Sequence, residues 1–265
     1  MPTLFLDIDN TLIYSHRHCI NTPKRVAEYL NGKEQSYITE KTYSYLSTRK
    51  DLQIVPVTTR TLPQFMRVEA LLRELGCTTA LICNGAVLLR DGAVDVAWMD
   101  ESLRLSEEER IDLPLAIQWL QSKCGSEKTH VADELFVYAG TDDPIGTARD
   151  LKQIIDIQKV DVLYDSRKVY CLPKTLNKGT ALRRFISQFG ISHSIVAGDS
   201  DFDVPMLNLG EHAIIPPDLV DKVFNNRVII ANEKQCFSDS ICDCIEKLLE
   251  NHRINRNGDA VWNNH

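Results

Sequence analysis

The chain has 265 residues, of which 43% are hydrophobic and 25% are charged, and its formal net charge is −7. This composition is typical of a globular protein, and the length suits one large domain or two smaller ones. A net negative charge without a run of Lys or Arg argues against sequence-independent binding of nucleic acid, which needs a concentrated basic face.

Neither a membrane span nor a secretory signal is expected from the sequence. No apolar stretch approaches the roughly 20 residues that a spanning helix needs. Residues 1–3 lead directly into an apolar run, without the basic segment that begins a signal peptide. The eight cysteines lie mostly in apolar segments and favour neither a disulfide framework nor a zinc site. We therefore expect a soluble, cytoplasmic protein.

Two carboxylates, Asp7 and Asp9, follow the first predicted strand. The strand is the short apolar run Leu4-Phe5-Leu6. Parallel sheets place ligands at the carboxyl ends of their strands, so both acids are candidates for a site. Crowded carboxylates need a counter-charge, and oxygen ligands favour Mg²⁺. Taken alone, the two acids could equally be turn or cap residues, which are common where strands end.

A small hairpin is predicted directly after these acids. Residues 26–30 and 34–38 flank Asn31-Gly32, a dipeptide that strongly favours a tight hairpin turn. We name this hairpin the flap. His16 and His18 precede it and could face the site, although solvated loop histidines are the more common case.

Helices and strands then alternate as far as residue 85. The predicted elements are a helix at 39–50, a strand at 52–57, a helix at 62–75 and a strand at 79–83. Thr39 is a suitable N-cap, whereas Pro56 is awkward for a central strand because it has no N–H to donate. The second strand runs into the polar segment Thr58-Thr59-Arg60. This alternation predicts a parallel sheet with right-handed crossovers.

A different pattern, typical of an α+β unit, occupies residues 86–173. Its predicted elements are a hairpin of 86–89 with 93–98, a helix from Ser106 or Asp112 to Cys124, strands at 129–131 and 135–138, a helix at 144–158, and a hairpin of 160–164 with 168–172 about Asp165-Ser166.

The α/β alternation resumes at Lys178. The predicted elements are helices at 179–189, 204–209 and 240–249 and strands at 194–197, 213–215 and 228–231. The strand at 194–197 runs into Gly198-Asp199-Ser200, and Asp203 follows. We expect a core of residues 1–85 and 174–251, an inserted unit at 86–173 and a polar tail at 252–265.

Taken in order, these polar segments resemble the four motifs of haloacid dehalogenase (HAD) superfamily phosphatases. The four motifs are matched by Asp7-x-Asp9-x-Thr11, Thr58-Thr59-Arg60, Leu172-Pro173-Lys174-x-x-x-Lys178-Gly179 and Gly198-Asp199-Ser200-x-x-Asp203, and Asn84-Gly85 also carries the resemblance. An insertion between the second and third motifs is similar to type IIB, the Cof-like and sucrose-phosphatase-like branch. The resemblance covers residues 1–250 and implies a Rossmann-like core with a C2-type α+β cap.

The resemblance implies catalytic roles for four residues. Asp7 would be the nucleophile that forms an aspartyl-phosphate, and Asp9 would be the general acid and then the general base. Thr58 would hydrogen-bond a phosphoryl oxygen, and Lys178 would offset the charge of Asp7 and the phosphate. Without the resemblance, Lys178 could simply be a lysine in the first turn of a helix.

The resemblance also implies the metal and substrate ligands. Asp7, the backbone carbonyl of Asp9, and Asp199 would bind Mg²⁺, while Asp203 would either ligate it or brace the other ligands. The residues implied to contact substrate are Arg60, Asn84 and Lys174. Lys174 could also be a solvated loop residue.

Two positions depart from the branch. Thr59 stands where Gly is common, and Phe202 stands where Asn is common before the last acid. Neither change removes a catalytic group, so both bear on the substrate rather than on the reaction.

The expected function is Mg²⁺-dependent hydrolysis of a small phosphorylated metabolite, with sugar phosphates as the default. One alternative is a phosphosugar mutase or phosphotransferase that passes the phosphoryl group to a hydroxyl. Another is a non-catalytic regulatory protein that binds a phosphorylated metabolite. The sequence gives no indication of the substrate or the oligomeric state.

Overall fold

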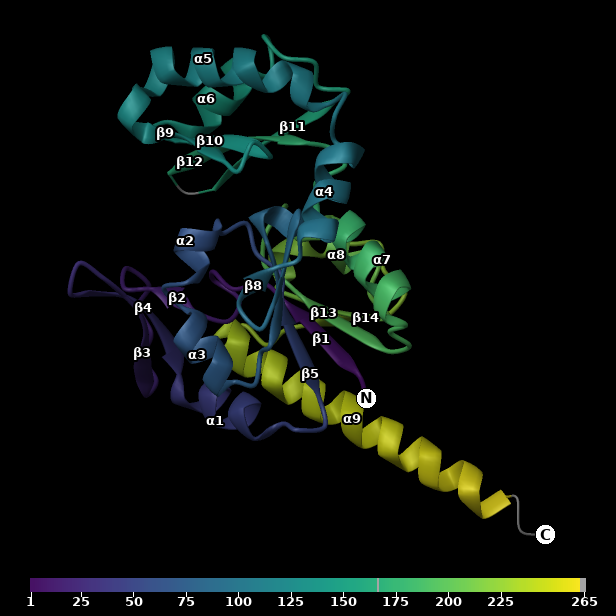
Figure 1. Cartoon of the computed structure of the whole chain (residues 1–265). Helices are drawn as coiled ribbons and strands as arrows, with labels where there is room; N and C mark the ends of the chain where they lie inside the picture. The colour runs from purple at the N-terminus through teal and green to yellow at the C-terminus, as the bar shows by residue number, and fades with distance from the viewer. Residues whose placement is uncertain (166, 263–265) are drawn as a thin grey trace.

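The computed structural model describes residues 1–165 and 167–262, which form an α/β core and a cap above it (Figure 1). Two parts of the sequence predictions lie outside the described residues, namely the hairpin turn at Ser166 and the tail at 263–265. Within the described chain, no helix combines the length and the apolar character that a bilayer crossing requires.

A five-stranded parallel sheet, in the order β15-β14-β13-β1-β5, forms the centre of the core. Its strands are β1 (Thr3–Leu6), β5 (Gln53–Pro56), β13 (Ser194–Ala197), β14 (His212–Ile215) and β15 (Val228–Ile230). The predicted parallel sheet is therefore confirmed, except that the strand predicted at 79–83 belongs to a separate antiparallel sheet. Pro56 lies opposite Leu6 on the outer strand β5, where a missing N–H is tolerated. Because β1 lies between β5 and β13, Asp7 is flanked by the ends of both.

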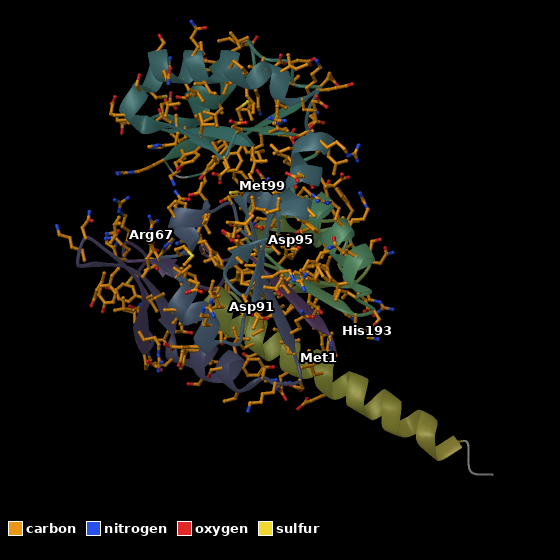
Figure 2. All side chains as sticks on the ribbon, viewed as in Figure 1. Met1, Arg67, Asp91, Asp95, Met99 and His193 are labelled. Atoms are coloured by element: carbon orange, nitrogen blue, oxygen red, sulfur yellow. The ribbon has the colours of Figure 1, made fainter. Side chains whose placement is uncertain are left out.

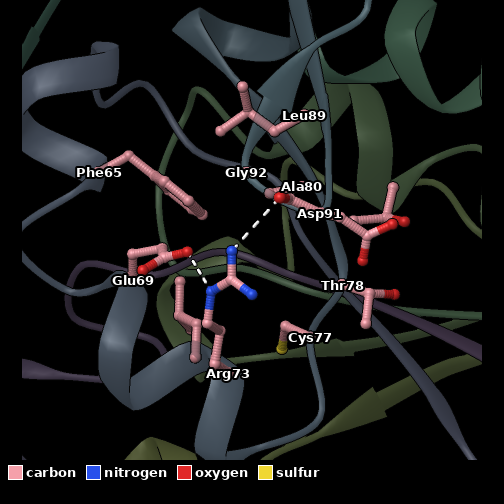
Figure 3. A pocket seen from close by; sticks show the side chains of 11 residues that line it. Phe65, Glu69, Arg73, Cys77, Thr78, Ala80, Leu89, Asp91 and Gly92 are labelled. Carbon is pink, nitrogen blue, oxygen red and sulfur yellow. Dashed lines mark hydrogen bonds and ion pairs between the residues drawn. The ribbon is translucent and has the colours of Figure 1, made fainter.

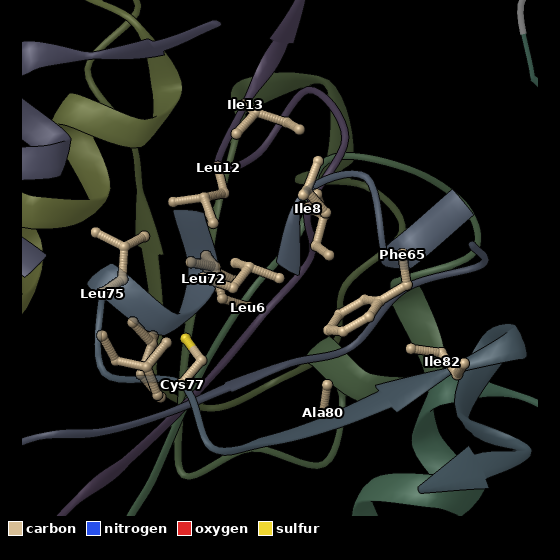
Figure 4. Close-up of a cluster of buried hydrophobic side chains, with 14 of the residues drawn as sticks. Leu6, Ile8, Leu12, Ile13, Phe65, Leu72, Leu75, Cys77, Ala80 and Ile82 are labelled. Carbon is tan, nitrogen blue, oxygen red and sulfur yellow. The ribbon is translucent and has the colours of Figure 1, made fainter. Parts of the chain in front are cut away.

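Helices cover both faces of this sheet, and two apolar clusters hold them there. The helices are α1 (Glu40–Thr48), α2 (Leu62–Phe65), α3 (Glu69–Glu74), α7 (Lys178–Phe189), α8 (Val204–Leu207) and α9 (Phe237–Trp262), with single 3-10 turns at η1 (Cys83–Gly85) and η4 (Pro217–Leu219). Leu4 and Leu6 of β1 belong to one cluster with buried residues of α1, α3 and α9. Figure 4 shows Leu6 near Leu72 of α3. Phe5 points to the other face and meets Phe185 of α7 edge-on, with ring centroids 5.4 Å apart. This alternation is the expected consequence of an extended strand.

The predicted boundaries of the helices at 62–75 and 240–249 are wrong. The helix expected at 62–75 is divided into α2 and α3, because a turn closed by the hydrogen bond from Val68 N to Phe65 O separates them. The turn buries Val68 and leaves Arg67 beside the flap (Figure 2). Helix α9, expected at 240–249, runs from Phe237 to Trp262, so the polar segment after residue 251 continues the helix.

The hairpin predicted at the start of the inserted unit pairs with the core. β6 (Thr79–Ile82), β7 (Val87–Arg90) and β8 (Ala93–Val94) form one antiparallel sheet. The strand predicted to reach residue 98 is wrong, because Asp95 caps helix α4 (Val96–Leu105) by accepting a hydrogen bond from Trp98 N. Trp98 Nε1 then donates to Gly85 O at 3.1 Å. The strand pairing thus favours a later core boundary than residue 86, and we propose that the core continues through α4.

The cap is a four-stranded antiparallel sheet with two helices packed on its outer face (Figure 1). Its elements are η2 (Arg110–Asp112), α5 (Leu113–Cys124), η3 (Ser126–Lys128), β9 (Thr129–Ala132), β10 (Phe136–Gly140), α6 (Pro144–Leu151), β11 (Val160–Asp165) and β12 (Lys168–Pro173). The predicted strands and the second candidate start of α5 are confirmed, whereas α6 ends at Leu151 rather than near residue 158. The strand order in the cap sheet is β11-β12-β10-β9. Phe136 and Tyr170 lie on its inner face and pack with residues of the core.

The flap is confirmed. β3 (Lys24–Leu30) and β4 (Lys33–Thr39) pair through a turn in which Asn31 and Gly32 have φ values of 51° and 74°, as a tight hairpin turn requires. A two-residue strand, β2 (Tyr14–Ser15), adds to the free edge of β4. The chain therefore places a three-stranded sheet directly after the two acids.

Close packing of α7 on α8 generates the first prediction. A Cβ at Gly179 would lie 2.5 Å from the backbone oxygen of Pro205, which cannot move aside as a side chain can. We expect Gly179→Ala to lower the free energy of unfolding by about 1–3 kcal/mol, although alanine is the better helix former. Urea denaturation measures this. Gly140→Ala is the control, because its Cβ would meet only an ordinary contact at 3.8 Å; equal stability of both variants would contradict the packing argument.

Candidate active site

A buried lysine links two buried carboxylates at the carboxyl end of the central sheet. Lys178 Nζ lies 2.5 Å from Asp7 Oδ1 and 2.6 Å from Asp203 Oδ1, and its side chain is 1% exposed. Burial opposes the charged ammonium, but Asp203 and Asp7 outweigh it and raise the pKa of Lys178 above its usual range. Three of the predicted site residues, from three distant segments, thus form one ion cluster.

Asp199 completes a set of oxygen ligands beside this cluster. Oxygens of Asp7, Asp199 and Asp203 lie within 4.8 Å of one another. Thr11 Oγ1 donates to Asp199 Oδ1 at 2.7 Å, and Asp203 Oδ2 accepts from the backbone nitrogens of Asp199 and Ser200 at 3.1 and 3.0 Å. These bonds fix the two carboxylates of the last motif relative to each other.

The charges of this set fit a divalent cation. Burial, with the neighbouring Asp203, raises the pKa of Asp199 to about 7. Burial also raises the pKa of Asp7 well above its usual value, although Lys178 pulls it down. Three clustered carboxylates with a single ammonium are short of positive charge, and an all-oxygen set is the kind that Mg²⁺ prefers.

Thr58 and Asn84 lie in the loops that flank Asp7. Thr58 follows β5, is 1% exposed, and accepts a hydrogen bond from Arg60 N. Asn84 N donates to Thr58 O, and Asn84 Nδ2 donates to Leu176 O at 2.8 Å. Asn84 thereby ties the Thr58 loop to the segment before Lys178. The substrate contact predicted for Asn84 stays a prediction, because its side-chain amide nitrogen bonds to the backbone at Leu176.

Asp9 lies apart from the ion cluster and is held by Arg60. The guanidinium donates from Nε and Nη2 to the two oxygens of Asp9, both at 2.7 Å. Burial would raise the pKa of Asp9, but Arg60 outweighs it and the pKa lies below its usual value. The Asp9 side chain is 50% exposed, whereas that of Arg60 is 9% exposed. Asp9 is therefore an ionised and half-exposed carboxylate.

Glu28 of the flap, which the sequence analysis missed, holds Arg60 in turn. Its carboxylate accepts from Arg60 Nη2 at 3.0 Å, from Arg67 Nε at 2.6 Å and from Ser36 Oγ at 3.2 Å. Register shifts on either side of Glu28 mark a β-bulge in the flap, a device that can turn a side chain inward. Burial would raise the pKa of Glu28, but the two arginines lower it below its usual value. Nothing in the spacing of the sequence could have signalled this contact.

A cavity of about 530 Å³ opens beside Asp9, between the segment before the flap, the core and the cap. Its lining residues are Asp9, Asn10, Ser15, Arg17, His18, Thr59, Arg60, Gln64, Arg67, Asp165, Arg167, Lys168 and Tyr170. His18 is among them, whereas His16 and Lys174 are not. The substrate contact predicted for Lys174 stays a prediction, while the tip of the cap hairpin contributes residues that the sequence did not suggest.

The two departures from the motif pattern meet at one cap residue. Phe202 packs edge-on against Tyr170, with ring centroids 5.1 Å apart. Burial raises the pKa of the Tyr170 hydroxyl, and Thr59, which lies next to that hydroxyl, acts to lower it. Tyr170 also stacks on Tyr138 of the cap at 5.6 Å, and Gln64 of the core donates to the Tyr138 hydroxyl at 3.3 Å. Both substitutions therefore fasten the cap to the core.

A second pocket is too small for a substrate (Figure 3). It encloses about 20 Å³, close to the space that one water needs. Arg73 closes it by an ion pair with Glu69 and a 3.3 Å hydrogen bond to Asp91 O. We assign no site to it.

No family model and no curated protein sequence matches the chain. Solved structures do match. Sucrose-phosphatase from Synechocystis sp. PCC6803 is 17% identical over 92% of this chain and 96% of its own, with a TM-score of 0.58. The HAD subclass IIB sugar phosphatase BT4131 is 14% identical over 94% and 99%, with a TM-score of 0.62. The chain has the HAD subclass IIB fold.

A third similar structure is a trehalose-6-phosphate phosphatase related protein, 18% identical over 94% of this chain and 99% of its own, with a TM-score of 0.51. The matches span nearly the whole length of each chain, so the HAD fold includes both core and cap. The predicted fold class is thereby confirmed.

The aromatic contact of this HAD cap generates the second prediction. We expect Phe202→Asn to lower the free energy of unfolding by about 2–4 kcal/mol, because it removes a buried ring and its edge-on partner. Hydrogen exchange should also become faster in peptides that cover β12, since Tyr170 would lose its contact with the core. Phe224→Asn is the control, because Phe224 is 83% exposed. Unchanged exchange of β12 in Phe202→Asn would show that the contact does not fasten the cap.

Proposed function

We propose that the protein is a Mg²⁺-dependent phosphatase that hydrolyses a small phosphorylated metabolite through an aspartyl-phosphate on Asp7. The observation that carries this proposal is the buried cluster of Asp7, Lys178, Asp199 and Asp203, which lies close to Asp9, a residue that lines the cavity. A nucleophile, a fixed cation, a set of metal ligands and a proton-transfer group thus share one site, as phosphoryl transfer requires.

In the first step, a carboxylate oxygen of Asp7 bonds to phosphorus and the ester P–O bond breaks. Asp9 supplies the proton to the leaving oxygen. In the second step, Asp9 takes a proton from water as the water oxygen bonds to phosphorus, and the bond between phosphorus and Asp7 breaks. Lys178 balances the charge at Asp7, and Thr58 donates to a phosphoryl oxygen.

The metal would be held by Asp7, the Asp9 carbonyl and Asp199, with Asp203 braced beside them by its backbone hydrogen bonds. When bound, Mg²⁺ supplies positive charge to the phosphoryl oxygens. Lys178 can neutralise only one of the three clustered carboxylates, so the site needs further positive charge.

The two proposed roles of Asp9 require different protonation states. Paired with Arg60, Asp9 is ionised and ready to act as the base of the second step. To act as the acid of the first step it must carry a proton, so the Arg60 contact has to loosen when substrate enters. How far the Arg60 guanidinium can move away from Asp9 then depends on its ion pair with Glu28.

The similar structures include phosphatases for sucrose phosphate and other sugar phosphates, which supports a small phosphorylated substrate. A phosphotransferase on the same site would pass the phosphoryl group from Asp7 to a sugar hydroxyl. Product analysis separates the two, because only hydrolysis releases inorganic phosphate.

The third prediction tests the nucleophile and the metal together. On a panel of phosphorylated metabolites with Mg²⁺, we expect phosphate release by the natural chain, loss of at least about 1,000-fold in Asp7→Asn, and loss after chelation that added Mg²⁺ reverses. Asp201→Asn is the control, because Asp201 pairs with Lys222 at 2.6 Å away from the ligand cluster. Turnover in Asp7→Asn, or turnover that persists with chelator, would contradict the proposal.

The fourth prediction concerns Glu28. A leaving group that needs little protonation, such as p-nitrophenolate, depends less on Asp9 than an alkoxide does. We therefore expect Glu28→Gln to lower kcat about 10-fold or more for alkyl phosphates and only a few-fold for p-nitrophenyl phosphate. Glu34→Gln, at an exposed position of the same hairpin, should leave both rates unchanged. Equal losses on the two substrates would mean that Glu28 only stabilises the fold.

A further inference from the structure

The cavity is cationic in a protein that is acidic overall. Five of its lining residues are Arg17, Arg60, Arg67, Arg167 and Lys168, against the two carboxylates of Asp9 and Asp165. Even with Glu28 counted behind the lining, the positive charges are in excess, whereas the whole chain carries −7. Charges of one sign that line a cleft raise the local concentration of the opposite ion.

The protein's own ion pairs account for only part of this charge. Arg60 and Arg67 are paired with Asp9 and Glu28. Among the ion pairs of the described residues, none includes Arg17, Arg167 or Lys168. These three come from the loop before the flap and from the tip of the cap hairpin, so they approach the cavity from two sides.

Lys168 is the best placed of the three. It begins β12, is partly buried, and its ammonium lies 5.3 Å from the centre of the Tyr138 ring. It interacts electrostatically with Asp9 and Asp165, and with Arg60 and Arg67 across the cavity. Asp9 and Asp165 favour the charged ammonium, whereas Arg60 and Arg67 oppose it, so a further anion between Lys168 and the two guanidiniums would stabilise all three positive charges.

The position of these charges relative to Asp7 determines which part of the substrate they contact, the transferred phosphoryl group or the leaving group. The phosphoryl group that is transferred lies at Asp7, where Lys178 and the metal ligands match its charge. In the proposed reaction Asp9 lies on the side of the leaving oxygen, and Asp9 lines the cavity together with Lys168, whereas Asp7 is not among the lining residues. The excess positive charge therefore faces the leaving group.

We propose that the leaving group of the substrate carries a second anionic group, a phosphate or a carboxylate, and that Lys168 is the residue that selects it. This inference rests on the proposed phosphatase function and deepens it. A charge-assisted hydrogen bond from a partly buried cation would favour an acidic substrate over its neutral counterpart.

Matched pairs of substrates test the proposal. The pairs are glucose 6-phosphate with 6-phosphogluconate, glycerol 3-phosphate with 3-phosphoglycerate, and glucose 6-phosphate with glucose 1,6-bisphosphate. Calorimetric titration of Asp7→Asn with Mg²⁺ measures their binding without turnover, so the outcome does not depend on hydrolysis. We expect the acidic member of at least one carboxylate or bisphosphate pair to bind at least 10-fold more tightly, and the ratio to fall as salt is added.

The same titration with Asp7→Asn/Lys168→Met assigns the selectivity. We expect the acidic-to-neutral ratio to fall toward one, whereas Asp7→Asn/Lys152→Met, altered at an exposed cap lysine outside the cavity, should keep it. Equal binding of both members in every pair overturns the inference, as does a ratio that survives loss of Lys168. Failure of hydrolysis by the natural chain, with the binding preference intact, would instead overturn the phosphatase assignment alone.

Discussion

The interaction on which the structure depends is the buried contact of Lys178 with Asp7 and Asp203. Removing one partner from such a cluster leaves an unpaired buried charge, which costs about 3–5 kcal/mol. Its members follow β1, begin α7 and precede α8, so the cluster can form only when the parallel sheet is assembled. The contact of Lys178 with Asp7 and Asp203 therefore serves both the proposed chemistry and the packing of the core.

A second polar network, next to this cluster, connects Asp9 to the flap. Asp9 is held by Arg60, Arg60 by Glu28, and Glu28 also by Arg67, so the flap is mechanically joined to the proposed proton-transfer group. On the opposite side, Tyr170 joins the cap to the core. The lining of the cavity comes from the segment before the flap, from the core and from the cap.

Local sequence signals predicted much of this arrangement, and the failures have physical reasons. Strand ends with Asp7, Thr58 and Asp199 were visible because a short apolar run and a polar residue mark them directly. The break between α2 and α3 was not, because residues 62–75 favour a helix and only the tertiary contacts of Val68 and Arg67 select the turn.

The missing parts of the site share one property, which is that they depend on contacts between distant segments. Glu28 turns inward through a bulge that no residue type marks, and Lys168 reaches the cavity only because the cap sheet packs as it does. Thr59 and Phe202 were recognised as departures, but their common partner Tyr170 could be found only in three dimensions. The most direct measurement of the central claim is a single turnover of p-nitrophenyl phosphate, quenched in acid and reduced with borohydride, which converts an aspartyl-phosphate to homoserine. The account predicts homoserine at position 7 in the peptide mass spectrum. Release of phosphate with no modified residue at position 7 would contradict it.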